Sequence, residues 1–451
     1  MKTITECRAC GSKALTPAFS LPAGLPPASD KRGAFSLRRA PKTDFVICDM
    51  SKDAFACGLL QSARVSDGVC EAVSGGYAAT RSHLRAAATE ALELISGRDC
   101  AALDIGCNDG TLLSFYPRWV ERYGVDPSGL VDHIGDWAKT AKAAFPSAGF
   151  DRAFGGSVFD IITAISVLEW LDEPRAFFAR AKSLLSPDGV LVVETLYAPL
   201  TLTRTAVEPV VGGVSAIYSL GVLERIVRDC DLKIFRGALT DKEGGSVRLF
   251  ITHKDVEEHD FDPWYERLAQ IWDEENALSL RSAQPYQVFE QRAVKAREDF
   301  LAMFEEMAAK GEIAHLLGAG AHSEALLAWA GEGRAVVKAA VAGGSRYAVG
   351  GLDVISETES RAAEPDVLIA PASLKREMLE RWRESILLGG RMVFASPEPH
   401  VVHAQNYVAE LAKTLAEGDG AGGTQTLRTI LRTVGGPRLV ANNMAAKAAS
   451  R

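Results

Sequence analysis

The feature that most constrains the fold is a glycine-rich turn directly after an apolar run, in the segment CAALDIGCNDGT at residues 100–111. The run over 100–105 predicts a buried strand, and Gly106 and Gly110 predict a tight turn from that strand into a helix. Glycine also lets a ligand approach the backbone closely. Because open α/β sheets bind ligands at the carboxyl ends of their strands, this turn predicts an α/β domain together with its ligand site.

The side chains of the turn indicate the chemistry of the ligand. A second predicted strand ends in Asp126, whose carboxylate can accept hydrogen bonds from both hydroxyls of a ribose. The turn lacks the G-x-G-x-x-G pattern of dinucleotide sites, and its acidic residues would repel a pyrophosphate. S-adenosylmethionine instead carries cationic amino and sulfonium groups, so we expect this methyl donor. A plain turn with a helix cap and a dinucleotide site are the alternatives.

Strands and helices alternate along most of the chain, which predicts mostly parallel sheets. We expect helices over 80–95 and 174–185 and strands over 122–125, 159–164, 189–194 and 245–252. A charged helical stretch over 256–310 precedes a second α/β pattern, with strands over 313–320, 336–341, 366–370 and 390–394. The sequence therefore predicts an N-terminal module (1–76), a central domain (77–255), a helical bridge with a C-terminal α/β domain (256–400), and a tail (401–451).

The N-terminal module is rich in proline, glycine and turn residues, so it requires a cross-link such as a bound metal ion to fold. Cys7 and Cys10 form one short knuckle, and Cys48 and Cys57 supply a second, more widely spaced pair. Four thiolates make a closed tetrahedral site, so we expect a structural zinc ion with no open position for catalysis. Ordinary reduced thiols are the plainer alternative.

Four segments resemble the strand-end motifs of class I methyltransferases: LDIGCNDGTLL, GVDPS, FDIITAISVLEWLDEP and SLLSPDGVLVVET. The first is similar in particular to zinc-containing sugar C-methyltransferases of deoxysugar pathways, and the similarity extends to about Pro399. This resemblance implies a zinc-binding module, a central Rossmann-like domain and a C-terminal Rossmann-like α/β domain that holds a nucleotide-sugar. It places Tyr77 over the donor, as a lid or orienting hydroxyl and as the expected catalytic residue. The expected donor-binding residues are Tyr77, Asp104, Gly106, Asn108, Asp109, Thr111, Asp126 and Ser166.

The catalytic motif of the resembled enzymes is absent from this sequence. Methylation of a carbon beside a carbonyl requires a base, and those enzymes carry a Tyr-His-Glu-His run before a helix that is recognisable here at residues 219–225. The run reads Val211-Gly212-Gly213-Val214, and Trp170 stands where another histidine is expected. Replacement candidates are Glu169, Tyr197, Tyr218 and His322; for each, a structural hydrogen bond is the plainer alternative.

The second α/β pattern opens with GAGAHS at residues 318–323, which predicts either a phosphate cradle at a helix N-terminus or a purely structural turn. The third glycine of a dinucleotide site is missing, and no acidic residue ends the next strand. We therefore do not expect bound NAD. A nucleotide-sugar diphosphate and a structural turn both stay open.

Charge and hydropathy limit the classes of partner that the chain can bind. The net charge of −8 and the lack of a long basic stretch argue against nucleic acid. No apolar run is long enough to span a bilayer, and the N-terminus lacks a signal-peptide core, so we expect a cytoplasmic protein without a membrane partner. The leading hypothesis is an S-adenosylmethionine-dependent methyltransferase acting on carbon in a small, nucleotide-sugar-like acceptor. O- or N-methylation of another glycan or natural product is the alternative, and a non-catalytic donor-binding scaffold is the rival from another class.

Overall fold

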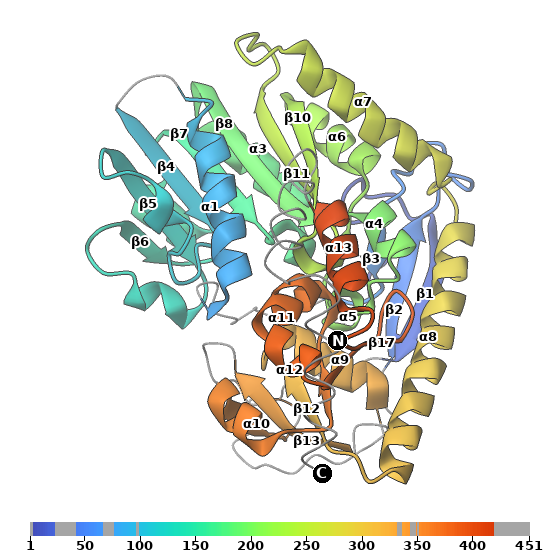
Figure 1. Cartoon of the computed structure of the whole chain (residues 1–451). Coiled ribbons are helices and arrows are strands. Elements are labelled where there is room, and N and C mark those ends of the chain that lie inside the picture. The colour runs from blue at the N-terminus through green and yellow to red at the C-terminus, as the bar shows by residue number, and fades with distance from the viewer. Residues whose placement is uncertain are drawn as a thin grey trace. The chain divides into compact units, whose positions relative to one another are not determined.

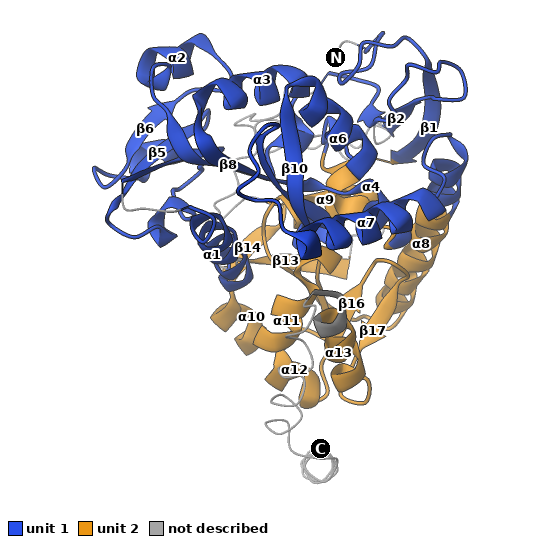
Figure 2. Cartoon of the chain, turned by 90° about the horizontal axis from the view of Figure 1, so that it is seen from above, with its two compact units in different colours: residues 1–21, 42–203, 213–291 blue, residues 22–41, 204–212, 292–451 orange. Residues whose placement is uncertain are grey.

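The computed structural model describes residues 3–22, 42–65, 76–95, 99–331, 336–342, 349 and 351–418. Figure 1 shows the helices and strands, and Figure 2 shows their division into two compact units. The described residues of 1–21, 42–203 and 213–291 form unit 1, and those of 204–212 and 292–451 form unit 2. The expected α/β architecture is confirmed, since both units are built around mostly parallel sheets.

Unit 1 contains a seven-stranded sheet in the order β10-β11-β8-β7-β4-β5-β6. Neighbouring strands are parallel except β11, which is antiparallel to both β8 and β10. The central strands β7 and β8 are apolar on both faces, as expected of parallel strands covered on both sides. The strands are β4 (Cys100–Ile105), β5 (Val120–Asp126), β6 (Lys139–Lys142), β7 (Phe159–Ile165), β8 (Leu185–Leu196), β10 (Leu232–Thr240) and β11 (Ser246–His253).

The predicted helices of unit 1 form where apolar residues recur at helical spacing. Helix α1 buries Leu84, Ala88 and Ala91 on one face, and Ser219 caps α6 by accepting a hydrogen bond from the Val222 amide. The helices are α1 (Ala78–Leu92), α2 (Ala148–Phe154), α3 (Pro174–Leu184), α4 (Ala198–Thr203), α6 (Leu220–Asp229) and α7 (Asp262–Ala277).

The helix expected directly after the glycine-rich turn is wrong. The chain forms only a 3-10 turn, η2 (Leu113–Phe115), and Tyr116 is extended with ψ 141°. Pro117 follows Tyr116, and the residue before a proline is excluded from helical backbone by clash with the pyrrolidine ring. The turn is therefore held by hydrogen bonds to neighbouring strands.

The N-terminal module contains strands that the sequence analysis did not predict. They are β1 (Leu15–Pro22), β2 (Lys42–Cys48) and β3 (Leu60–Ser62), which join the distant β9 (Ala216–Ile217) in a four-stranded sheet. Arg8, whose side chain is only 4% exposed, links this module to the larger sheet through its ion pair with Asp172 (Nε to Oδ1, 2.7 Å). Its guanidinium also donates to the Ser62 carbonyl (2.7 Å).

Unit 2 carries a six-stranded sheet in the order β14-β13-β12-β15-β16-β17, parallel except for β17. Its strands are β12 (Ala314–Leu317), β13 (Val337–Ala342), β14 (Asp353–Ser356), β15 (Val367–Ile369), β16 (Arg391–Phe394) and β17 (His400–Val402). Its helices are α5 (Val207–Val211), most of α8 (Gln284–Ala309), α9 (Ala321–Ala330), α10 (Glu357–Ala363), α11 (Lys375–Arg381), α12 (Arg383–Leu387) and α13 (Tyr407–Gly418). The predicted tail, 401–451, is described as far as residue 418, and its remaining residues, 419–451, lie outside the described part of the chain.

None of the described helices combines the length and the apolar character needed to cross a bilayer.

Candidate functional site

The glycine-rich turn is bound to the ends of two neighbouring strands, β4 and β5. Gly106 has φ +75°, and a Cβ atom there would lie 2.5 Å from Cγ2 of Val167, so glycine is required at this position. The Gly106 amide donates to the Val125 carbonyl (2.8 Å), and the Asn108 amide donates to Oδ2 of Asp126 (3.0 Å). These bonds collect the polar side chains of the turn at the carboxyl edge of the sheet.

The second half of the turn is held by its own side chains. Oδ1 of Asp109 accepts hydrogen bonds from the Thr111 amide (3.1 Å) and the Thr111 hydroxyl (2.7 Å). Gly110 has φ +76°, and the Ile134 side chain packs against it. The conformation of the turn is thus defined by the residues that were expected to bind the donor.

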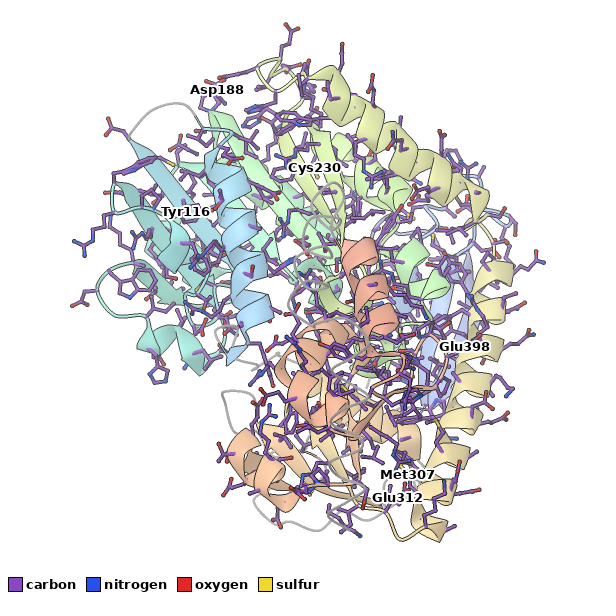
Figure 3. All side chains as sticks on the ribbon, viewed as in Figure 1. Tyr116, Asp188, Cys230, Met307, Glu312 and Glu398 are labelled. Atoms are coloured by element: carbon purple, nitrogen blue, oxygen red, sulfur yellow. The ribbon has the colours of Figure 1, made fainter. Side chains whose placement is uncertain are left out.

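A buried carboxylate lies at the base of the turn. Asp104 is 3% exposed, and its Oδ1 accepts a hydrogen bond from the Thr163 hydroxyl (2.6 Å). Burial is the main cause that raises the pKa of Asp104 to about 7; the nearby carboxylates of Asp126 and Asp109 contribute, and the hydrogen bond from Thr163 acts in the opposite direction. Tyr116, labelled in Figure 3, is buried within range of Asp104, and burial together with that carboxylate raises its pKa. This arrangement favours a ligand that brings positive charge.

A small cavity opens beside Asp104 at the carboxyl edge of β4 and β7. Its lining residues come from α1, the turn and the end of β7: Leu84, Asp104, Gly106, Cys107, Leu112 and Ile165. Burial, followed by the nearby Asp104, raises the pKa of the Cys107 thiol, so Cys107 stays protonated at neutral pH and packs rather than reacts.

The remaining expected donor residues lie on the segments around this edge. Ser166 directly follows β7 with φ +56°, and its amide donates to the Glu194 carbonyl (2.9 Å). Tyr77 is the extended residue before α1, partly exposed, and its carbonyl accepts from the Arg81 amide (3.0 Å). The binding role of each of these residues stays a prediction.

The sequence analysis missed a buried polar cluster on the next strand along. Glu194 of β8 is fully buried; its Oε2 accepts from Arg248 Nε (2.6 Å), and its Oε1 lies 2.7 Å from Nε2 of His83 and 2.8 Å from the Thr240 hydroxyl. Burial alone would raise the pKa of Glu194, but the charge of Arg248, together with the contacts of His83 and Thr240, holds it well below its ordinary value. No local motif marks this cluster, because its members come from α1, β8, β10 and β11.

Two of the four replacement candidates for the missing base are buried structural residues. The Tyr197 hydroxyl donates to Oε2 of Glu275 (2.9 Å), and the Tyr218 hydroxyl donates to the Leu168 carbonyl (3.2 Å). Burial raises the pKa of both phenols. Each tyrosine therefore satisfies a buried acceptor, and neither side chain reaches solvent.

Glu169 and His322, the other two candidates, lie in different units. Glu169 is fully buried, its Oε2 accepts from the Thr195 hydroxyl (2.9 Å), and burial followed by the Glu243 charge raises its pKa to about 8. His322 is the second residue of α9 in unit 2. Trp170, where the family's histidine was expected, lies in the 3-10 turn after β7, and its carbonyl accepts from the Ser215 hydroxyl (3.2 Å).

The four N-terminal cysteines come together although Cys10 and Cys48, the nearest members of the two pairs in sequence, are 38 positions apart. All four Sγ atoms lie within 4.8 Å of one another, with Cys7 to Cys57 and Cys10 to Cys48 each at 3.5 Å. Tetrahedral zinc with bonds of about 2.3 Å places its sulfurs roughly 3.8 Å apart, so these spacings fit that ion. The wide gap between Cys48 and Cys57 is explained by a turn that Asp49 stabilises through hydrogen bonds from Thr16 and Ser51.

Comparison with known families matches the two α/β regions separately. Residues 77–235 match the family described as a methyltransferase domain, and residues 241–397 match the family described as the C-methyltransferase C-terminal domain. The first match and the strand order define an S-adenosylmethionine-dependent methyltransferase with the class I fold. The second match shows that residues 241–397 are similar to the C-terminal domain of C-methyltransferases.

Two curated relatives illustrate the range of similarity. The C-methyltransferase NovU of Streptomyces niveus is 22% identical over 324 residues, which are 67% of this chain and 74% of that protein. The malonyl-[acyl-carrier protein] O-methyltransferase of Hahella chejuensis is 29% identical over 134 residues, which are 26% of this chain and 43% of that protein. The NovU match thus spans far more of this chain than the malonyl O-methyltransferase match.

Among solved structures, an S-adenosylmethionine-dependent methyltransferase from Clostridium acetobutylicum aligns with 12% identity and a TM-score of 0.30, over 40% of this chain and 92% of that one. Magnesium protoporphyrin IX methyltransferase from Synechocystis, solved with bound SAH, aligns with 18% identity and a TM-score of 0.32, over 38% of this chain and 82% of that one.

Proposed function

We propose that this methyltransferase transfers the methyl group of S-adenosylmethionine to a carbon atom beside a carbonyl in a small, nucleotide-sugar-like acceptor. The observation that carries the proposal is the combination of an acidic donor turn with a following C-methyltransferase C-terminal domain. NovU, which aligns with 67% of this chain, is itself named a C-methyltransferase, and this supports carbon as the target.

The expected donor-binding residues contact different groups of S-adenosylmethionine in this proposal. Asp126 accepts two backbone amides, Asn108 and Ser128 (2.7 Å), and keeps lone pairs for the two ribose hydroxyls of the donor. Asp104 and Asp109 provide the negative charge that the donor's ammonium and sulfonium groups require. When bound, the donor supplies an electrophilic methyl group, so the protein has to align the acceptor and expose its electron pair.

We propose that the four cysteines bind a structural zinc ion. A closed set of four thiolates leaves no open coordination position, so the ion stabilises the module without taking part in the chemistry. Metal analysis of protein purified without chelator is the direct test. About one zinc per chain is expected, and protein without zinc would refute the proposal.

We further propose that the C-terminal sheet contributes to acceptor binding through its strand ends. The order of its strands reverses between β12 and β15, and such a switch point is where open α/β sheets bind ligands. The turn after β12 begins with Gly318 at φ +75° and leads into α9, whose N-terminus favours anions such as a diphosphate.

Calorimetric titration with S-adenosylmethionine and S-adenosylhomocysteine tests the donor assignment, and binding by neither would refute it. Incubation with labelled methyl donor and a panel of nucleotide-linked keto sugars, followed by mass spectrometry, tests the acceptor. A product with the new methyl group on carbon is expected. Methylation on oxygen or nitrogen would refute carbon as the target; the replacement of the family's Tyr-His-Glu-His run by residues 211–214 is the observation that favours this second function.

A further inference from the structure

The buried cluster around Glu194 lies directly beside the donor cavity. Leu84, the chain neighbour of His83, lines that cavity, and so does Ile165, which pairs with Glu194 in the sheet register. Glu194 is fully buried, whereas the His83 side chain is 19% exposed. Of the three ionisable members of the cluster, Glu194, Arg248 and His83, the histidine is therefore the one that solvent or an acceptor can reach.

The hydrogen bonds define which nitrogen of His83 carries the proton. Arg248 keeps the Glu194 carboxylate ionised, so that carboxylate only accepts hydrogen bonds. Nε2 of His83 lies 2.7 Å from Oε1 of Glu194, which only accepts, and 3.1 Å from Nη2 of Arg248, which only donates. We assign the proton to Nε2 because the contact with the carboxylate is the shorter of the two. In a neutral imidazole the other nitrogen, Nδ1, is then unprotonated, and no hydrogen bond within the described residues uses it.

Stability alone does not explain such a cluster. Replacing a buried ion pair by apolar residues of similar size is often neutral or stabilising, so the cost of burying Glu194 and Arg248 calls for another role. A carboxylate that orients an imidazole and fixes its tautomer is a recurring device of general base catalysis. The reaction proposed above requires a base, and the family's own motif is missing.

We propose that His83 is the general base of this enzyme, with Glu194 and Arg248 as its positioning residues. The inference rests on the proposed C-methylation. Nδ1 takes a proton from the carbon beside the acceptor carbonyl. The electron pair of the broken carbon–hydrogen bond then forms an enolate, in which the negative charge lies on the carbonyl oxygen. The enolate carbon uses this electron pair to form the new bond to the methyl group, while the electrons of the broken methyl–sulfur bond stay on sulfur. The proton on His83 leaves to water.

Two charged groups contact the imidazole, Glu194 of β8 and Arg248 of β11. Three more charged groups act on these two: Glu90 of α1 and Arg236 of β10 belong to the ion pairs around Arg248, and Lys242 of the 3-10 turn η5 (Lys242–Gly244) interacts electrostatically with Glu194. Arg236 and Arg248 both pair with Glu90 (3.5 and 3.3 Å). The negative charges of Glu194 and Glu90 are thus offset by two arginines.

The first test is nitrogen NMR of the full chain labelled at histidine, with S-adenosylhomocysteine bound. The His83 signals are assigned from the spectrum of H83Q, and H253Q is the control, because His253 lies at the far end of the strand that carries Arg248. A proton on Nε2 and none on Nδ1 at neutral pH is expected. A proton on Nδ1 instead would overturn the proposal.

The second test follows deuterium exchange from heavy water into the panel of nucleotide-linked keto sugars, with S-adenosylhomocysteine in place of the methyl donor. Glutamine retains a donor for Glu194 but is no base, so H83Q should slow exchange by about 10²- to 10⁴-fold with S-adenosylhomocysteine affinity unchanged. Exchange at the wild-type rate, or loss of S-adenosylhomocysteine binding together with exchange, would show that His83 is not the base. If wild type exchanges none of the sugars, the acceptor assignment fails, while the nitrogen spectra still decide the role of His83.

Discussion

The donor turn predicts that cofactor affinity depends on pH near neutrality. Asp104 is buried, its pKa is raised to about 7, and no cation is among the causes that set this value. A cationic donor binds the ionised carboxylate better than the protonated one, so binding lowers the pKa of Asp104. Affinity should therefore rise as the pH increases through 7 and fall as the pH decreases.

The magnitude follows from the fraction of protein in the binding-competent state. With a pKa of about 7, roughly one tenth of the molecules carry ionised Asp104 at pH 6 and roughly nine tenths at pH 8. Because the apparent Kd is the intrinsic Kd divided by that fraction, the Kd at pH 6 should be about tenfold higher than at pH 8. At pH 7, complex formation should release about half a proton, the fraction that is still protonated.

Isothermal titration calorimetry with S-adenosylmethionine at pH 6, 7 and 8, in two buffers of different ionisation enthalpy, measures both quantities. D104N should bind more weakly at pH 8 and lose most of the pH dependence. D151N, which changes an exposed carboxylate on α2, should keep the wild-type slope. A wild-type Kd that is flat between pH 6 and 8, or a full slope in D104N, would refute the reasoning.

Three further predictions concern stability. Gly106→Ala puts a Cβ atom 2.5 Å from Val167 at a left-handed residue, and it should cost at least about 1–2 kcal/mol in chemical denaturation together with donor affinity; wild-type values for both would contradict the contact. Glu194→Gln leaves the buried Arg248 without its charge partner and should cost about 3–5 kcal/mol, whereas the exposed Glu306→Gln should leave the denaturation midpoint unchanged; equal effects of the two would contradict the burial argument. Removal of metal with a chelator should lower the thermal midpoint, and replenished zinc should restore it; a midpoint insensitive to chelation would count against structural zinc.

Local sequence was enough to predict the tight turn after β4, which we propose as the donor site. Its strand, both glycines and Asp126 lie within residues 100–126, and the hydrogen bonds that shape the turn join residues at most about twenty positions apart. The sequence also contains the reason why no helix follows the turn, because Pro117 disfavours helical backbone at the preceding residue.

The contacts between residues far apart in the sequence could not be predicted in the same way. The contacts of Glu194 with His83 and Arg248 span 111 and 54 residues, and they arise only once β8 pairs with β11 and α1 covers the sheet. The strand β3 likewise finds its partner β9 more than 150 residues further on. Sequence periodicity identifies which residues are buried in a strand but not which strands become neighbours, so a cluster assembled across strands has no sequence signature.

Asp104 and Glu194 show how one sheet edge supports two different tasks. Both carboxylates are buried at the carboxyl ends of parallel strands, yet the pKa of Asp104 is raised and that of Glu194 is lowered. The difference is Arg248, a permanent cation that the chain supplies to Glu194 (2.6 Å) and does not supply to Asp104. A carboxylate with its own cation is ready at all times to hold an imidazole in one tautomer, whereas a carboxylate without one gains its full charge only when a cationic ligand arrives. Placing an arginine near Asp104 would therefore stabilise the ionised carboxylate but remove the reason for the donor to bind there.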